Sequence, residues 1–157
     1  MFRPILSATL AVALGTGAAL AMSDDEHAAA LRALDDEFAA YATYTAILDK
    51  FGQVQPFVSV HQAEAKHIAA ISDVLAADGI EVPQNPYLNG EKPAPQAPAS
   101  VQEACAIGVQ AEIANAALYD DELLPQVAGN PELTQVFASL RDASQNHHLP
   151  AFEACAQ

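Results

Sequence analysis

The stretch Glu64-Ala65-Lys66-His67 decides how the rest of the sequence is interpreted, because it sets a carboxylate and an imidazole three residues apart. Residues at this spacing share one face of a helix. The apolar residues around the motif recur at helical spacing, so Glu64 and His67 fall on the row that should face a core. A buried carboxylate loses much hydration energy unless a positive partner meets it. A metal ion is such a partner, and its other ligands can be sought in the sequence.

Residues 1–21 have the pattern of a secretory signal peptide. Arg3 precedes an apolar run, and Ala19-Leu20-Ala21 fits an Ala-x-Ala cleavage site. The run is short for a membrane span, and an uncleaved anchor is the alternative. We therefore expect an exported protein, periplasmic or secreted, with no membrane attachment after cleavage. The domain should comprise residues 22–157, which is 157 − 21 = 136 residues and enough for one core.

The chain is strongly acidic, with 6 Lys and Arg against 20 Asp and Glu. The leader holds Arg3 and no acid, so the rest has 5 − 20 = −15 formal charges. Such a charge repels nucleic acids and anionic membrane surfaces, and neither is expected as a partner. The same charge gathers cations near the surface, which is consistent with metal ions as partners.

Two cysteines, Cys105 and Cys155, are present. In an exported chain they favour one disulfide. Two free buried thiols and a metal-binding pair of thiols are the alternatives.

Two helices are predicted in the first half of the domain. Ser23-x-x-Glu26 is a capping box, and the helix that it begins should end at Gly52. A second helix, over residues 56–79, carries the opening motif and begins with proline. The core-facing row of the first helix contains a single acid, Glu37, as the row of the second contains Glu64.

Residues 80–99 contain five prolines and cannot form a helix. Twenty extended residues span roughly 60 Å, about twice the ~30 Å length of a 20-residue helix. We interpret this segment as a crossover along the outside of a helical bundle. A flexible linker between two helical hairpins is the alternative.

Two more helices are predicted in the second half. Ser100-x-x-Glu103 is another capping box, and its helix should end before Pro125. Asn130-Pro131 combines an N-cap with proline at the first helical position. Pro150 should kink or fray the end of this last helix. The core-facing row of the third helix again contains one acid, Glu112.

The cysteines also predict a register between the last two helices. In antiparallel neighbours, facing residues have a constant sum of residue numbers, and Cys105 with Cys155 gives the same sum as Glu112 with His148. A disulfide would therefore place Glu112 opposite His148. This favours His148 over His147, which lies about 100° further round the helix.

Each half thus offers an inward glutamate followed by a motif. Glu37 precedes Glu64-x-x-His67, and Glu112 precedes Gln145-x-x-His148. The core-facing row before His148 allows Ser144 or Gln145. This arrangement resembles the ferritin-like four-helix bundle, whose carboxylate di-metal site takes Glu and Glu-x-x-His from each half. The resemblance implies an all-α, up-down bundle with a long crossover between the second and third helices.

Several stretches are also similar to a ferritin-like domain of unassigned function in exported bacterial proteins, over nearly all of residues 30–155. They are Asp36-Glu37-Phe38, Phe51-Gly52, Ala63-Glu64-Ala65-Lys66-His67, Ala111-Glu112-Ile113-Ala114-Asn115 and His148-Leu149-Pro150-Ala151-Phe152. The resemblance implies a metal site, with iron as the first choice and manganese or zinc as alternatives. Its ligands would be Glu37, Glu64, His67, Glu112, His148 and, as a weaker donor, Gln145.

Gln145 departs from the full di-metal pattern, because an amide offers an oxygen but no charge. Three carboxylates do not neutralise two divalent ions, so a single ion or a weak second position is expected. If the protein has a catalytic activity, we expect oxidation of the bound metal by oxygen or peroxide. The alternative is a non-catalytic structural or interaction module with a degenerate site. The same core-facing rows also contain Tyr41, Tyr44 and Tyr119. These should be core residues whose hydroxyls bind carboxylates.

The sequence leaves the oligomeric state open, and a homo-oligomer is possible.

Overall fold

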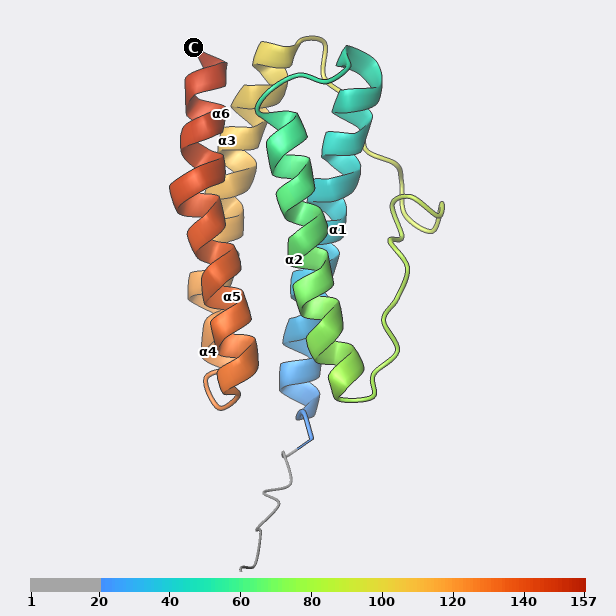
Figure 1. Cartoon of the computed structure of the whole chain (residues 1–157), viewed down its shortest axis with the longest axis vertical. Coiled ribbons are helices and arrows are strands. Elements are labelled where there is room, and N and C mark those ends of the chain that lie inside the picture. Colours follow the sequence, from blue (N-terminus) through green and yellow to red (C-terminus); the bar gives the residue numbers. More distant parts are fainter. Residues whose placement is uncertain (1–20) are drawn as a thin grey trace, which may run out of the picture.

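The computed structural model describes residues 21–157. Residues 1–20, where most of the predicted signal peptide lies, are outside the described part. All regular secondary structure in residues 21–157 is helical, and the helices lie side by side along one direction (Figure 1). This confirms the all-α prediction. Among the described residues, none of the helices combines the length and apolar character needed to span a membrane.

Helix α1 (Asp24–Phe51) begins and ends as its sequence predicts. The Ser23 hydroxyl accepts a hydrogen bond from the Glu26 amide, and the Glu26 carboxylate accepts one from the Ser23 amide at 2.8 Å. Gly52 ends the helix with a φ of 79°, a conformation that glycine adopts at little cost. Helix α2 (Phe57–Ala77) returns along α1 (Figure 1).

Residues 78–100 contain neither helix nor strand, and they run along the outer side of the helices toward the start of α3 (Figure 1). Side chains fasten this segment to α1. The Asn85 amide donates a hydrogen bond to the Phe38 carbonyl at 3.0 Å, and Lys92 forms an ion pair with Asp35 at 2.5 Å. The segment therefore packs against α1 over part of its length.

Residues 101–156 form two longer helical runs, each interrupted by one π-helical turn. The first run comprises α3 (Val101–Leu118), η1 (Tyr119–Leu123) and α4 (Leu124–Gln126). The second comprises α5 (Pro131–Ala143), η2 (Ser144–His148) and α6 (Leu149–Ala156).

The expected end of the third helix before Pro125 is wrong, because the helical run continues to Gln126. Proline lacks an amide proton and collides with the carbonyl four residues earlier in a regular α-helix. The π-helical turn η1 relieves this conflict: the Leu124 amide bonds to the Tyr119 carbonyl, five residues back. The wider turn lets the chain pass Pro125 without leaving the helical path.

The same solution appears before Pro150. The Leu149 amide bonds to the Ser144 carbonyl in η2, and α6 then continues to Ala156. The distortion predicted at this proline therefore takes the form of one wide turn. Both π-helical turns are followed by a Leu-Pro pair.

Two apolar clusters fill the interior and leave a polar layer between them. One cluster includes Leu34, Ile71 and Phe137, and the other includes Ile47, Phe57 and Phe152. On each helical run, the buried acids and histidines lie between the residues of these two clusters. The site residues are therefore shielded from water by apolar side chains at both ends.

The predicted disulfide between Cys105 and Cys155 is confirmed. It joins the first turns of α3 to the end of α6, with the Cα atoms 5.7 Å apart and a sequence separation of 50 between the cysteines. Cys105 is fully buried in the second apolar cluster. The bond therefore fixes α3 and α6 next to each other at one end of the molecule.

Replacing both cysteines, as Cys105→Ala with Cys155→Ala, should lower the free energy of unfolding by about 3–4 kcal/mol, because the unfolded chain regains the entropy of a 50-residue loop. Urea unfolding followed by circular dichroism measures this change. The double variant should remain helical at low urea, since most of the core does not involve the cysteines. An unchanged unfolding free energy would contradict a stabilising role of the bond.

Candidate metal centre

The polar layer contains three carboxylates and two imidazoles that come from all four long helical runs. Glu37 lies on α1, Glu64 and His67 on α2, Glu112 on α3 and His148 at the end of η2. Glu37, Glu64, Glu112 and His148 are only 2%, 3%, 4% and 5% exposed. Three acids at this depth need partners that offset the loss of hydration and their mutual repulsion.

His67 joins the first two acids. Its Nδ1 atom lies 3.1 Å from Oε2 of Glu37 and 2.9 Å from Oε2 of Glu64. Burial opposes charging of the imidazole, but the hydrogen bonds to both carboxylates outweigh it and raise the pKa of His67 to about 10. Without a metal ion, protonated His67 is therefore the cation of this half of the layer.

Glu64 and Glu37 respond differently to the same environment. Burial raises the pKa of Glu64 well above its usual range. Burial also opposes ionisation of Glu37, but hydrogen bonds with His67, Glu64 and Tyr119 outweigh it and lower the pKa of Glu37. The shared carboxylate, Glu64, is thus the one that holds its proton most readily in the metal-free protein.

His148 joins Glu64 to the third acid without a hydrogen bond. Its Nδ1 atom lies 3.4 Å from Oε1 of Glu64 and 3.4 Å from Oε2 of Glu112. This buried nitrogen has no hydrogen-bond partner among the described residues. Buried polar atoms are nearly always paired, so an unpaired nitrogen between two carboxylates indicates a place for an additional ligand or ion.

The five residues form two overlapping groups that could each hold a metal ion. One consists of Glu37, Glu64 and His67, and the other of Glu64, Glu112 and His148; in each, potential ligand atoms lie within 4.8 Å of one another. The His67 and His148 rings are stacked with centroids 5.5 Å apart. Mixed carboxylate and imidazole donors suit iron, manganese and zinc. Glu64 belongs to both groups, so its two oxygens could serve two adjacent positions.

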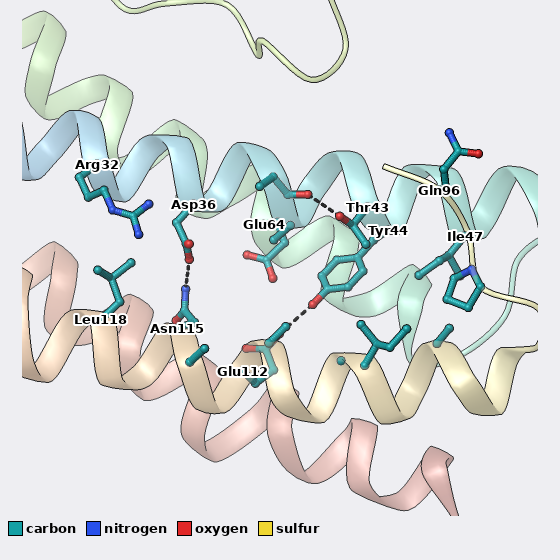
Figure 2. A pocket seen from close by; sticks show the side chains of 18 residues that line it. Arg32, Asp36, Thr43, Tyr44, Ile47, Glu64, Gln96, Glu112, Asn115 and Leu118 are labelled. Atoms are coloured by element: carbon teal, nitrogen blue, oxygen red, sulfur yellow. Dashed lines mark hydrogen bonds between the residues drawn. The ribbon is translucent and has the colours of Figure 1, made fainter. Parts of the chain in front are cut away.

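Two buried tyrosines hold the outer carboxylates in a crosswise arrangement. Tyr44 donates to Oε1 of Glu112 at 2.9 Å, as Figure 2 shows, and Tyr119 donates to Oε1 of Glu37 at 2.8 Å. Each tyrosine follows the other's glutamate by seven residues along its own helical run. Burial and the nearby carboxylates raise the pKa of both phenols well above 10, so they remain neutral donors. Donors of this kind orient the carboxylates of metal sites.

The structure brings Glu37, Glu64, His67, Glu112 and His148 together, as the sequence predicts. Tyr44 and Tyr119 also bind carboxylates as expected. Tyr41 does not, because its ring is half-buried and stacks on His61 at 4.0 Å outside this layer. His147, the rejected alternative to His148, is exposed.

Gln145 is not part of the cluster, which corrects its prediction as a weaker metal ligand. Its side chain is exposed, and its Nε2 atom lies 3.4 Å from Oδ2 of Asp120. The π-helical turn η2 adds one residue to the turn before His148, so the inward position falls four residues earlier, at Ser144. Ser144 is buried and donates to the Asn115 side chain at 2.6 Å. The inward position one turn before His148 is therefore occupied by a hydroxyl side chain.

A second polar network lies beside Glu112 and includes Asp36 and Ser144, neither of which was predicted as a ligand. The Asn115 amide donates to Asp36 at 2.8 Å, as Figure 2 shows, and accepts the Ser144 hydroxyl. Burial raises the pKa of Asp36. This network could have been predicted from two positions in the sequence: Asp36 is next to Glu37, and Asn115 follows Glu112 by three residues. The network links α1, α3 and η2.

Models of protein families, curated proteins and solved structures gave no match to this chain. The class of the site is therefore defined by its own residues, as a buried cluster of carboxylates and imidazoles in an all-helical protein.

Removing one tyrosine hydroxyl should destabilise the protein by about 1–3 kcal/mol, because a buried carboxylate oxygen loses its donor. We expect this result for Tyr44→Phe and for Tyr119→Phe in urea unfolding with a chelator present. Tyr41→Phe is the matched control, since Tyr41 lies outside the layer, and it should change the unfolding free energy least. Equal effects of all three variants would contradict the role assigned to the two buried hydroxyls.

Proposed function

We propose that this protein is an exported, ferritin-like four-helix-bundle protein that binds divalent metal ions, iron first, in the buried layer. The ligands would be Glu37, Glu64, His67, Glu112 and His148. The single observation that carries this proposal is Nδ1 of His148, which is buried without a hydrogen-bond partner and 3.4 Å from an oxygen of each of Glu64 and Glu112. A bound cation would meet all three groups at once.

The arrangement of the chain supports the ferritin-like part of the proposal. The helical runs lie side by side, and the proline-rich segment runs along their outside from α2 to α3 (Figure 1). Each pair of runs contributes one glutamate and one histidine-bearing helix to a shared centre, as in carboxylate-bridged di-metal bundles. The disulfide agrees with export, because such bonds persist in oxidising compartments.

The charges of the ligands support one firmly held ion and a weaker second position. Three carboxylates carry three negative charges, whereas two divalent ions carry four positive ones. Ser144 supplies no charge where the full pattern has a carboxylate, and Gln145 lies outside the cluster. A second ion would therefore need an additional anion.

Bound iron would supply one-electron chemistry with oxygen or peroxide. The chain's own residues orient the ligands and exclude water. Tyr44 and Tyr119 fix one oxygen of Glu112 and of Glu37, which leaves the other oxygen of each acid directed at a histidine. The apolar clusters at both ends keep the layer at low dielectric, where charge interactions are strong.

A non-catalytic helical module is the second candidate, and His67 is the observation that favours it. Its hydrogen bonds to Glu37 and Glu64 give this half of the layer a cation without any metal. The two candidates differ in one measurable property, the metal content of the native protein.

Protein purified from its native compartment without added metal should carry close to one or more ions of iron, manganese or zinc per chain by elemental analysis. Glu64→Gln should reduce this content severalfold or more, because Glu64 belongs to both ligand groups. Glu153→Gln, at an exposed position of α6, is the matched control and should leave the content unchanged. A metal-free native protein would support the non-catalytic module, and equal metal content in both variants would place the metal outside this layer.

Gln145→Glu should not increase the number of metal ions per chain, although it restores the Glu-x-x-His pattern in the sequence. The new carboxylate would lie at the exposed position near Asp120, away from the ligands. Anaerobic titration of the metal-free wild type and variant with ferrous ion compares the two stoichiometries. A higher stoichiometry in the variant would show that residue 145 turns inward when metal binds.

A further inference from the structure

A cavity of about 340 Å³ lies between α1 and α3 and reaches the proposed metal centre (Figure 2). Its walls are mostly apolar and come from Ala39, Ala40, Ile47, Ala104, Ile107 and Ala111. Gln96 and Pro98, from the segment before α3, also line it. Its volume lies within the range of small-molecule sites, which are typically apolar with a few convergent polar groups.

The polar groups of the cavity gather at its inner side. Glu64, Glu112 and the hydroxyl-bearing ring of Tyr44 line it there, and Figure 2 shows all three directed toward the space between α1 and α3. Glu64 and Glu112 are also two members of the second ligand group, with His148. A molecule in the cavity would therefore have its inner end beside that group.

The wall formed by α3 is unusually apolar for a helix at the surface. Between Ala104 and Leu118 the only charged residue is Glu112, which is buried. Ile107, on the cavity wall, is 49% exposed. Helices that face water normally carry a polar stripe. Covering the exposed apolar surface of α3 with an apolar molecule is therefore favourable, because it removes that surface from water.

The charges of the lining select against anions. Asp36, Glu64 and Glu112 are acidic, and Arg32 is the one basic residue of the lining. An apolar body with a negative group would meet these carboxylates at short range.

We infer that the cavity binds a small, uncharged and mostly apolar molecule whose single hydroxyl group reaches Glu64 and Glu112. The apolar body covers Ile107 and the alanines, and the hydroxyl lies beside the proposed metal centre. The inference about the cavity stands on its lining; contact between the molecule and a metal rests on the function proposed above.

Phenol is the probe, because it combines an apolar ring with one hydroxyl, and benzoate is its negatively charged comparison. Titrations of the disulfide-intact, metal-free protein are followed by amide chemical shifts in NMR. Phenol should bind saturably and shift amides of α1 and α3 around the cavity. Benzoate should bind about tenfold more weakly or not at all, a difference of about 1.4 kcal/mol.

Ala111→Phe should fill the cavity from its α3 wall and weaken phenol binding about tenfold or more. Ala106→Phe is the matched control, because Ala106 is exposed on the same helix and does not line the cavity. It should leave phenol binding unchanged. Ala40→Leu fills the cavity from the α1 wall and repeats the test if Ala111→Phe does not fold.

Absence of saturable phenol binding would overturn the inference, as would unchanged binding in both cavity-filling variants or benzoate binding as tight as phenol. The metal measurement is separate. Phenol binding to a protein that never takes up metal would refute the proposed function and retain the cavity site. Metal binding without phenol binding would support the proposed function and refute the cavity site.

Discussion

The burial of three carboxylates in one layer is the constraint on which the rest of this structure depends. Glu37, Glu64 and Glu112 are each at most 4% exposed, and no helix could bring them there without compensating partners. Protonated His67 compensates the first two, and the crosswise phenols satisfy the outer acids. The layer lies between two apolar clusters. A shift of one of its side chains out of the layer would therefore disturb the packing of both clusters.

The two π-helical turns are the backbone devices that complete this layer. Tyr119 is the first residue of η1 and His148 is the last residue of η2. Each turn precedes a Leu-Pro pair, and a proline would disrupt a regular α-helix at that position. The wide turn lets the helix continue past the proline while Tyr119 and His148 still face the layer. Such turns are frequent at functional sites, and here they place one phenol and one imidazole against buried acids.

The sequence predicted the features that depend on local chemistry or on regular helix geometry. The capping box at Ser23 and the glycine at position 52 set the ends of α1. The register from the disulfide correctly placed His148 opposite Glu112, because the residues between His148 and Cys155 form regular α-helix. One turn further, the core-facing row allowed Ser144 or Gln145, and the Glu-x-x-His pattern favoured Gln145. The structure places Ser144 inside, because the extra residue of η2 is invisible to a 3.6-residue period. The partner of Tyr41 depended on packing across helices, which periodicity does not encode.

The two halves of the site are related in pattern but unequal in composition, and the inequality coincides with the cavity. The first half contributes Glu64, whose two carboxylate oxygens lie near Nδ1 of His67 and Nδ1 of His148. The second half has the hydrogen-bonded pair of Ser144 and Asn115 beside Glu112. Of the two ligand groups, only the second contributes both of its carboxylates to the cavity lining, while Glu37 and His67 lie away from it. The group that contains His148 is thus the one that borders the cavity. Under the proposed function, a metal ion held there would lie beside an apolar cavity, from which a ligand could reach it.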